Sequence, residues 1–522
     1  MPTSFRSIIR HRHAPAIVVA VVGALIYAVW QPPSNDFAVQ HFRFELFRES
    51  PFAIWNNQWF AGHHTPAYSL LVPLLGSVLG PVWMGSICVV VGAWLGSLLV
   101  HRLVELHPDL RYPRVASVML VLGLLASLYG GRTTFLLGSV IGIGALHASL
   151  TSHWRITALS ALFTAFASPV AGLFLAVIGM AVVCARSLSV RHGLALVVPP
   201  LAAIGAVAVL FPEGGDFPFP RGGVINVVLA TAVLAVLGWR YLFMRWMCLG
   251  YAAFVVLCAV LTTPVGGNAA RLLALAAPVV LVMVARLAVP WVAIMLVPLL
   301  ALGWAPVSAM VTLDHEQSEE EFYLPLIDVL EALPAPLRVE VVPLATHGEA
   351  DWVGLSVPIA RGWNRQLDRK YNSLFYGRSL TPDQYLDWLQ SLGVRYVAIA
   401  DATLDVAGEL EAELLADPPS YLKKIHDDGM WRVYEVVAHT ELIASGHAEL
   451  TELITDSFRL HLDGDGPVVV RVRFSPWFRV TEGDACVRPN SLGWTVVSGP
   501  EGDVRIRASL SAFAVLDHNG DC

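Results

Sequence analysis

The sequence predicts a polytopic α-helical membrane protein with about 11 transmembrane helices and a water-soluble C-terminal half. Three observations predict this class. The 522 residues are 56% hydrophobic and only 14% charged, with a mean hydropathy of +0.61, whereas soluble proteins carry about 25% charged residues. Long apolar runs fill residues 1–313. The charge then changes sign: residues 1–313 contain seven acids and 17 Arg, and residues 314–522 contain 34 acids and 17 basic residues.

The first apolar run covers residues 14–30 and follows the basic stretch RSIIRHRH. No clear small-residue cleavage site follows it, so we interpret it as an uncleaved first helix. Spanning a bilayer takes about 20 apolar residues. The other candidates for spans are residues 82–101, 115–130, 135–150, 156–167, 170–185, 192–211, 224–239, 246–262, 270–286 and 290–311.

The distribution of Arg predicts the orientation of these helices. With the N-terminus in the cytoplasm, 12 of the 17 Arg fall on the cytoplasmic side, as the positive-inside rule expects. An odd number of helices then places the C-terminal half outside. The apolar segment 67–79 contains Pro73 and is too short to cross, so we interpret it as a re-entrant or interfacial helix. The pair Ser168-Pro169 divides another apolar stretch into two helices.

The soluble half reads as two modules. In residues 314–440, Thr381-Pro382-Asp383 opens a helix that Gly393 ends, and VRYVAIA and WRVYEVV read as strands on either side of a second helix, which predicts an α/β domain. In residues 441–522, alternating segments such as PVVVRVRFS predict an antiparallel, β-sandwich-like module. No Ser-His-Asp set, zinc-ligand spacing or Gly-rich phosphate loop is evident in this half. Its acidity, about −17 by formal charge, argues against nucleic acid as a partner.

A polar and aromatic loop follows the first helix, in residues 31–81, within the predicted membrane domain of residues 1–313. Its aromatic residues suit a membrane–water interface, and VQHFRFELFRE has the spacing of a helix lying on the outer leaflet. Asp36 stands six residues beyond the first helix. Its carboxylate could accept a proton from an attacking hydroxyl, or it could cap the next helix. The residues alone leave both interpretations open.

This order of parts resembles the GT-C superfamily of integral-membrane glycosyltransferases. The matching features are Asn35-Asp36, the loop segment WFAGHHTPAY and the segment PVGGNAARLLAL; the last two, with ARGWNRQLDRKYN, LGVRYVAIAD and FSPWFRV in the tail, also resemble membrane proteins of the YfhO-like kind. The resemblance implies a GT-C-like membrane domain and Asp36 as the catalytic base. The family acid often stands in an Asp-Asp or Asp-Glu pair, which Asn35-Asp36 departs from.

The resemblance also implies a polyprenyl-phosphate sugar as donor. A lipid phosphate needs a cation, and the guanidinium group of Arg matches phosphate geometry. Arg132, Arg221 and Arg271 are each expected on the outer side with Gly close by, so we expect them to bind the donor phosphate. The alternative for each is a contact with lipid headgroups or an ion pair. Residues expected to shape the acceptor or substrate cavity are His41, Glu45, Trp59, His63, His64 and Asn268. Two adjacent His without further ligands do not indicate a metal site.

The first hypothesis for function is therefore a glycosyltransferase on the outer face of a bacterial plasma membrane. It would transfer a sugar from a polyprenyl-phosphate donor to a cell-envelope glycan, lipid or protein, with membrane lipid as partner and no separate cofactor. The alternatives are a transporter or flippase of a lipid-linked or small substrate, and a non-catalytic GT-C-like scaffold that binds envelope-assembly proteins. Two observations argue against the transporter hypothesis: the apolar runs hold few acids or His, and they show no paired repeat.

Cysteine usage separates the two halves. Four Cys lie in the apolar runs, and Cys486 and Cys522 are the two in the soluble half. An extracytoplasmic location is oxidising, so we expect Cys486 and Cys522 to form a disulfide.

Overall fold

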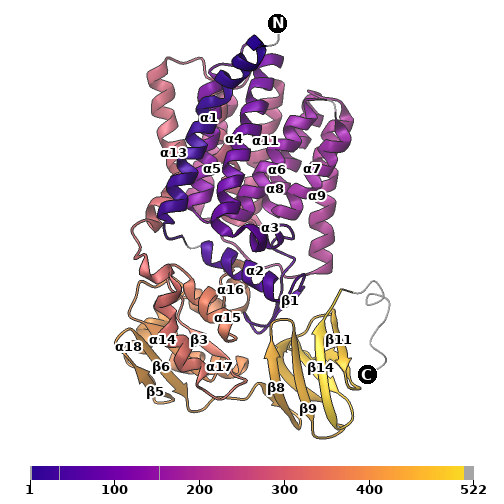
Figure 1. The fold of residues 1–522 in the computed structure, drawn as a ribbon, viewed down its shortest axis with the longest axis vertical. Coiled ribbons are helices and arrows are strands. Elements are labelled where there is room, and N and C mark those ends of the chain that lie inside the picture. Colours follow the sequence, from indigo (N-terminus) through magenta and orange to yellow (C-terminus); the bar gives the residue numbers. More distant parts are fainter. Residues whose placement is uncertain (1–2, 35, 152, 511–522) are drawn as a thin grey trace. The chain divides into compact units, whose positions relative to one another are not determined.

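The computed structural model describes residues 3–34, 36–151 and 153–510 of the chain. The chain divides into two compact units. The first comprises Met1–Gln40 and Ala67–Thr312, and the second comprises His41–Pro66 and Leu313–Cys522. In Figure 1 the helices of the first unit run side by side as a bundle, and the sheets of the second are coloured orange and yellow.

The first unit has a helix at each of the eleven positions that the apolar runs predict, within the described residues. They are α1 (Thr3–Trp30), α4 (Pro81–Leu106), α5 (Pro113–Tyr129), α6 (Thr133–Ser149), α7 (Trp154–Ala167), α8 (Pro169–Ala185), α9 (Val190–Leu210), α10 (Arg221–Leu237), α11 (Leu242–Val260), α12 (Arg271–Val284) and α13 (Val289–Met310).

Six of these segments are long and apolar enough to cross a membrane: Arg12–Trp30, Pro81–Leu106, Val190–Leu210, Leu242–Val260, Gly266–Val284 and Val289–Met310. The other five helices, α5, α6, α7, α8 and α10, have only 14 to 17 residues, whereas a span takes about 20. The number of crossings, and with it the side on which the C-terminal half lies, therefore stays a prediction.

Two local predictions about this unit are confirmed. Ser168 separates α7 from α8, and its hydroxyl accepts a hydrogen bond from the backbone N–H of Ala171. The segment after the loop forms only the eight-residue helix α3 (Val72–Leu79), which is too short to cross a bilayer. Its Val78 side chain is 78% exposed, and a re-entrant or interfacial position for this helix stays a prediction.

The second unit contains an α/β domain. Its sheet has the strand order β3-β4-β6-β5, in which β3 (Val339–Val341) and β4 (Tyr396–Ala400) are parallel while β6 (Trp431–Val436) and β5 (Leu422–Asp427) are antiparallel to their neighbours. The helices of this domain are α14 (Glu320–Glu331), the short α15 (Gly354–Ser356), α16 (Arg365–Tyr371), α17 (Pro382–Leu392) and α18 (Glu409–Ala416), with a π-helical turn at Glu349–Val353 and 3-10 turns at Glu316–Ser318 and Ser373–Tyr376. Thr381 and Gln384 form a capping box that begins α17, and Gly393 ends it at a φ of 67°. The predicted start and end of this helix are confirmed.

The end of the second unit is the antiparallel β module that the alternating segments predict. One sheet has the order β12-β13-β10-β7 and the other has the order β11-β14-β9-β8. The strands are β7 (Ile443–Ser445), β8 (Ala448–Ile454), β9 (Ser457–Leu462), β10 (Val468–Arg473), β11 (Phe478–Glu482), β12 (Cys486–Pro489), β13 (Trp494–Ser498) and β14 (Gly502–Ala508). Cys522 lies outside the described residues, so its pairing with Cys486 stays a prediction.

The loop segment His41–Pro66 folds as part of the second unit. The helix α2 (Phe37–Glu49) begins in the first unit and ends in the second. Beyond it, β1 (Trp55–Asn56) and β2 (His63–His64) form a small hairpin, and the backbone N–H of Asn57 donates to the carbonyl of Thr455 at 2.7 Å. Phe42, Phe44, Trp55, Trp59 and Phe60 are almost fully buried.

The expectation that this loop spreads its aromatic residues over the membrane surface is therefore wrong for most of them. Burying a large aromatic side chain in protein removes as much apolar surface from water as burying it in lipid, and it adds specific packing. Phe52 is an exception, because its side chain is 73% exposed.

Candidate functional site

The structure brings Asp36 together with two arginines of the first unit. The Nε atom of Arg132 lies 3.6 Å from the Oδ2 atom of Asp36, and the Nη2 atom of Arg271 lies 3.8 Å from the same oxygen. The three side chains are between 21% and 23% exposed. They come from three segments that are about 95 to 235 residues apart in the sequence. Two guanidinium groups therefore face one carboxylate at a partly accessible position.

A glycine allows this approach. Gly131, between α5 and α6, has a φ of +67°, which residues with a Cβ rarely adopt. A Cβ at this position would lie 2.4 Å from the Oγ atom of Ser34 and 2.6 Å from the backbone nitrogen of Phe37. The turn that carries Arg132 thus packs directly against the backbone of Asp36 and Phe37.

Both arginines stand where a helix begins. Arg132 is the residue before α6, and Arg271 is the first residue of α12 and follows a 3-10 turn at Gly266–Ala270. The guanidinium carbon of Arg271 also lies 5.6 Å from the centroid of the Phe135 ring. The start of a helix carries a partial positive charge from its unpaired N–H groups. At these two starts, the N–H groups of Thr133 and Arg271 already donate to the carbonyls of Gly131 and Asn268, so the preference for an anion comes from the guanidinium groups.

A small cavity adjoins the two arginines within the first unit. Besides Arg132 and Arg271 it is lined by Gly123, Ala126, Ser127, Phe135, Ala274, Leu275 and Gly303, which come from α5, α6, α12 and α13. Most of these side chains are small and apolar. The cavity is thus charged where the arginines line it and apolar elsewhere.

The third predicted phosphate ligand is not part of this cluster. Arg221 is the first residue of α10 and is exposed. In the described ranges, the ion pairs of Asp36 go to Arg132 and Arg271 and none goes to Arg221. Asn268 is 8% exposed and lies in the 3-10 turn that precedes Arg271. A role for Arg221 or Asn268 in binding stays a prediction.

The remaining predicted residues of the acceptor site belong to the second unit. The Nδ1 atom of His41 lies 2.9 Å from the Oδ2 atom of Asp351, and its Nε2 atom lies 3.5 Å from the Oε1 atom of Glu45. Burial would lower the pKa of His41, but the hydrogen bond and charge of Asp351 raise it above its ordinary value. Burial raises the pKa of Asp351 to about 6, although His41 opposes this shift. Asp351 is a partner that the sequence did not reveal.

Trp59, His63 and His64 are interior residues of the same unit. The indole N–H of Trp59 donates to the carbonyl of Ala350 at 2.9 Å, and the ring of His63 stacks on it with the centroids 5.8 Å apart. The Nε2 atom of His64 lies 3.0 Å from the Oγ atom of Ser475. His63 and His64 are 2% and 6% exposed. Contact of these residues with an acceptor stays a prediction, and their observed contacts are with protein.

Comparison with known proteins gives one kind of match. No family model matches this chain, and no curated protein matches it. Thirteen chains of solved structures do match. One is the oligosaccharyltransferase of Archaeoglobus fulgidus in its apo form, with 11% sequence identity and a TM-score of 0.44 over 74% of this chain and 69% of that chain.

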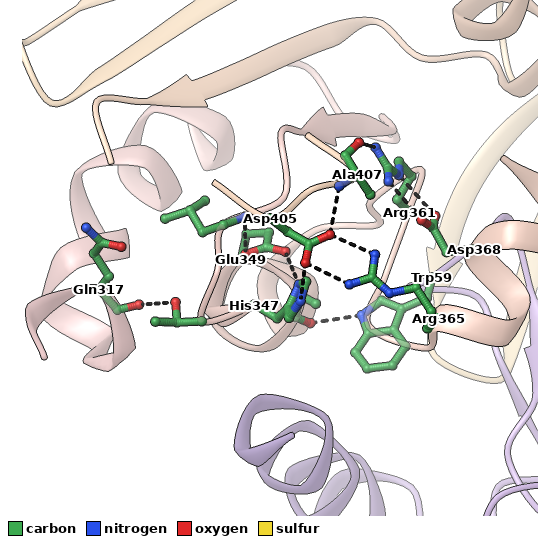
Figure 2. A network of polar contacts seen from close by, with 12 residues as sticks. Trp59, Gln317, His347, Glu349, Arg361, Arg365, Asp368, Asp405 and Ala407 are labelled. Carbon is green, nitrogen blue, oxygen red and sulfur yellow. Dashed lines mark hydrogen bonds and ion pairs between the residues drawn. The ribbon is translucent and has the colours of Figure 1, made fainter. Parts of the chain in front are cut away.

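A network of charged groups that the sequence did not reveal lies in the α/β domain. Figure 2 shows Asp405 between His347 and Arg365. Arg365 donates two hydrogen bonds of 2.7 Å to the carboxylate of Asp405, and His347 lies 3.5 Å from Asp405 and 3.4 Å from Glu349. Burial would lower the pKa of His347, but Asp405 and Glu349 raise it. The network joins the loops that follow the parallel strands β3 and β4.

A second charged cluster lies around Arg361, which is 3% exposed. Arg361 donates hydrogen bonds of 3.0 and 2.8 Å to Asp368, and its Nη1 atom lies 3.7 Å from Glu340 and 3.5 Å from Glu411. Glu340 and Glu411 have no measurable exposure. Burial raises the pKa of both, with Arg361 opposing the shift. In the sequence, this cluster is indicated only by the charged residues of ARGWNRQLDRKYN, and the segment does not show which distant residues they contact.

The His, Cys, Asp and Glu side chains of the described residues are the possible metal ligands. None of their His, Cys, Asp and Glu side chains form a group of three or more that could hold a metal ion.

Proposed function

We propose that the protein is a glycosyltransferase of the outer face of a bacterial plasma membrane, which transfers a sugar from a polyprenyl-phosphate donor to a cell-envelope acceptor. The observation that carries the proposal is the cluster of Asp36, Arg132 and Arg271 in a unit of apolar helices. A carboxylate beside two guanidinium groups combines a proton acceptor with ligands for a phosphate leaving group.

In this proposal the two arginines bind the donor phosphate and Asp36 acts on the acceptor. The acceptor hydroxyl oxygen forms a bond to the anomeric carbon of the sugar, while the bond from that carbon to the phosphate oxygen breaks. The electron pair of the broken bond goes to the phosphate, whose growing negative charge Arg132 and Arg271 stabilise. The hydroxyl proton goes to the carboxylate of Asp36. The lipid phosphate leaves, and the acceptor carries the sugar.

The test is a deletion strain complemented with wild-type protein or with Asp36→Asn. We expect the deletion strain to accumulate a lipid-linked sugar and to lack one envelope glycan. The Asp36→Asn protein, present at the wild-type level, should neither remove the accumulated lipid-linked sugar nor restore the glycan. A general base contributes about 10²–10⁴-fold in rate. Full complementation by Asp36→Asn would remove the proposed base, and an unchanged set of envelope glycans in the deletion strain would instead favour a transporter or a scaffold.

A further inference from the structure

The ion pairs of Asp36 are longer than hydrogen bonds. Its Oδ2 atom lies 3.6 Å from Arg132 and 3.8 Å from Arg271, whereas an N–H···O hydrogen bond in a protein spans about 2.7–3.2 Å. The Nε atom of Arg132 is buried and makes no hydrogen bond among the described residues. The attraction between these groups is therefore electrostatic, and hydrogen-bonding capacity of the arginines remains available for a ligand.

The same chain also contains arginine–aspartate pairs at hydrogen-bond distance. Arg361 binds Asp368 with two hydrogen bonds of 3.0 and 2.8 Å, and Arg365 binds Asp405 with two of 2.7 Å. These four side chains are between 3% and 17% exposed. The pairs that stabilise the α/β domain are thus short and bidentate, while the pairs of Asp36 are longer than hydrogen bonds.

The charges at Asp36 are also unequal. Two guanidinium groups face one carboxylate. A cavity adjoins the two arginines. A phosphate group carries more negative charge and more acceptor oxygens than one carboxylate, and it can accept bidentate hydrogen bonds from each guanidinium.

We propose that Asp36 occupies, in the free protein, the position of an anionic ligand, and that a phosphate ester displaces it from Arg132 and Arg271. Asp36 then competes with the ligand for the same two cations. Once displaced, its carboxylate is no longer held by the arginines and is available to accept a proton. This inference rests on the proposed function for the phosphate role of the arginines, and it adds that ligand binding itself releases the base. No covalent bond changes in the exchange.

The experiment measures binding to the full chain in detergent by isothermal titration calorimetry. The probes are farnesyl phosphate, inorganic phosphate and farnesol. We expect Asp36→Asn to bind farnesyl phosphate about tenfold more tightly than the wild type, because a competing charge is removed at a partly screened position. Arg132→Gln and Arg271→Gln should each weaken binding about tenfold or more. Farnesol should not bind. Tighter binding of farnesyl phosphate than of inorganic phosphate supports a lipid source, and equal binding supports a free phosphate.

Asp109→Asn is the matched control. Asp109 also lies between two arginines, at 3.4 Å from Arg240 and 3.5 Å from Arg286, and it belongs to the loop between α4 and α5. Its substitution changes the net charge equally but should leave the affinity for farnesyl phosphate unchanged. If Asp36→Asn unfolds at a lower temperature than the wild type, Asp36→Ser provides the same comparison.

The experiment distinguishes the competition by Asp36 from the anion site formed by Arg132 and Arg271. Unchanged or weaker binding by the Asp36 variants, with binding lost in the arginine variants, would overturn the competition and leave the arginines as phosphate ligands. Normal binding by both arginine variants would overturn the anion site, and with it the phosphate part of the proposed function. Equal strengthening by Asp109→Asn would also overturn the competition, because a change in net charge would then account for the effect.

Discussion

Asp36 gains its candidate role from its neighbours. A carboxylate after a membrane helix can cap the next helix or act as a base. The structure places the guanidinium groups of Arg132 and Arg271 beside this carboxylate, and a helix cap does not need them. At the scale of the residue, Gly131 allows the Arg132 turn to lie against the backbone of Asp36.

We therefore expect Gly131→Ala to disturb the site. The left-handed conformation costs a residue with a Cβ about 1–2 kcal/mol, and the new methyl group would collide with Ser34 and Phe37. The expected results are a lower unfolding temperature in detergent and weaker binding of farnesyl phosphate. Gly144→Ala is the control, because the nearest atom to a Cβ there is 3.7 Å away. Wild-type binding by Gly131→Ala would show that the turn tolerates a side chain.

At the scale of elements, the α/β domain is held by buried charges that connect its strands and helices. Glu340 lies on β3, Glu411 on α18 and Asp368 on α16, and all three approach Arg361. Three acids and one guanidinium leave an excess of negative charge in the interior. Ionising all of them there is costly, so burial keeps protons on Glu340 and Glu411 over a wider range of pH.

Because Glu340 and Glu411 keep their protons in the folded protein, we predict that its stability depends on pH. The pKa of both carboxyls in the folded protein is above the ordinary value of 4.5. The folded protein therefore holds protons that the unfolded chain releases, and this stabilisation is complete below the ordinary pKa and is lost as the pH rises through the folded-state values. We expect the unfolding free energy of the second unit to fall as the pH rises from the ordinary value of 4.5 to about 7, the pKa to which burial raises Glu411, by up to about 1.4 kcal/mol per pH unit for each retained proton.

The measurement is thermal unfolding of the full chain, followed by tryptophan fluorescence at a series of pH values. Glu411→Gln replaces the protonated acid with a neutral group and should reduce the slope. Glu413→Gln is the control, because Glu413 lies on the same helix and is exposed. The same slope in the wild type and Glu411→Gln would contradict the explanation.

The β module supplies a second prediction at this scale. Cys486 begins β12, at an edge of one sheet, and we expect it to pair with Cys522. The closed loop of about 36 residues would stabilise the folded module by roughly 4 kcal/mol in the chain-entropy model. Peptide mass spectrometry without reduction should find the linked peptides, and Cys522→Ser should lower the unfolding temperature. Alkylation of both thiols in the unreduced protein would exclude the bond.

At the scale of the whole molecule, charge and apolar length divide the chain into a membrane-type half and a soluble half. We predict that the soluble half is extracytoplasmic, from the distribution of Arg and the odd number of helices. In a Cys184→Ser background, an impermeant maleimide should label Ser379→Cys on intact cells and should not label Ser187→Cys in the predicted cytoplasmic loop. Both positions are exposed. The reverse pattern would invert the topology and place the Asp36 site on the cytoplasmic side.

The sequence by itself determined the features that short segments encode. The apolar runs placed all eleven helices, Ser168-Pro169 separated α7 from α8, and Thr381 with Gly393 bounded α17. These features follow from local hydropathy, caps and backbone preferences, whose free energies depend on neighbours a few residues away. The alternating strands of the β module could be predicted for the same reason.

Only the tertiary structure decided which distant groups meet. It joined Arg132 and Arg271, but not Arg221, to Asp36, and it folded the segment His41–Pro66 into the second unit. All three arginines have a glycine within four residues and look equivalent in the sequence. Their difference lies in helix packing and in one close backbone approach at Gly131. Such contacts depend on the complementarity of surfaces that are far apart in the chain, and no local pattern records that complementarity.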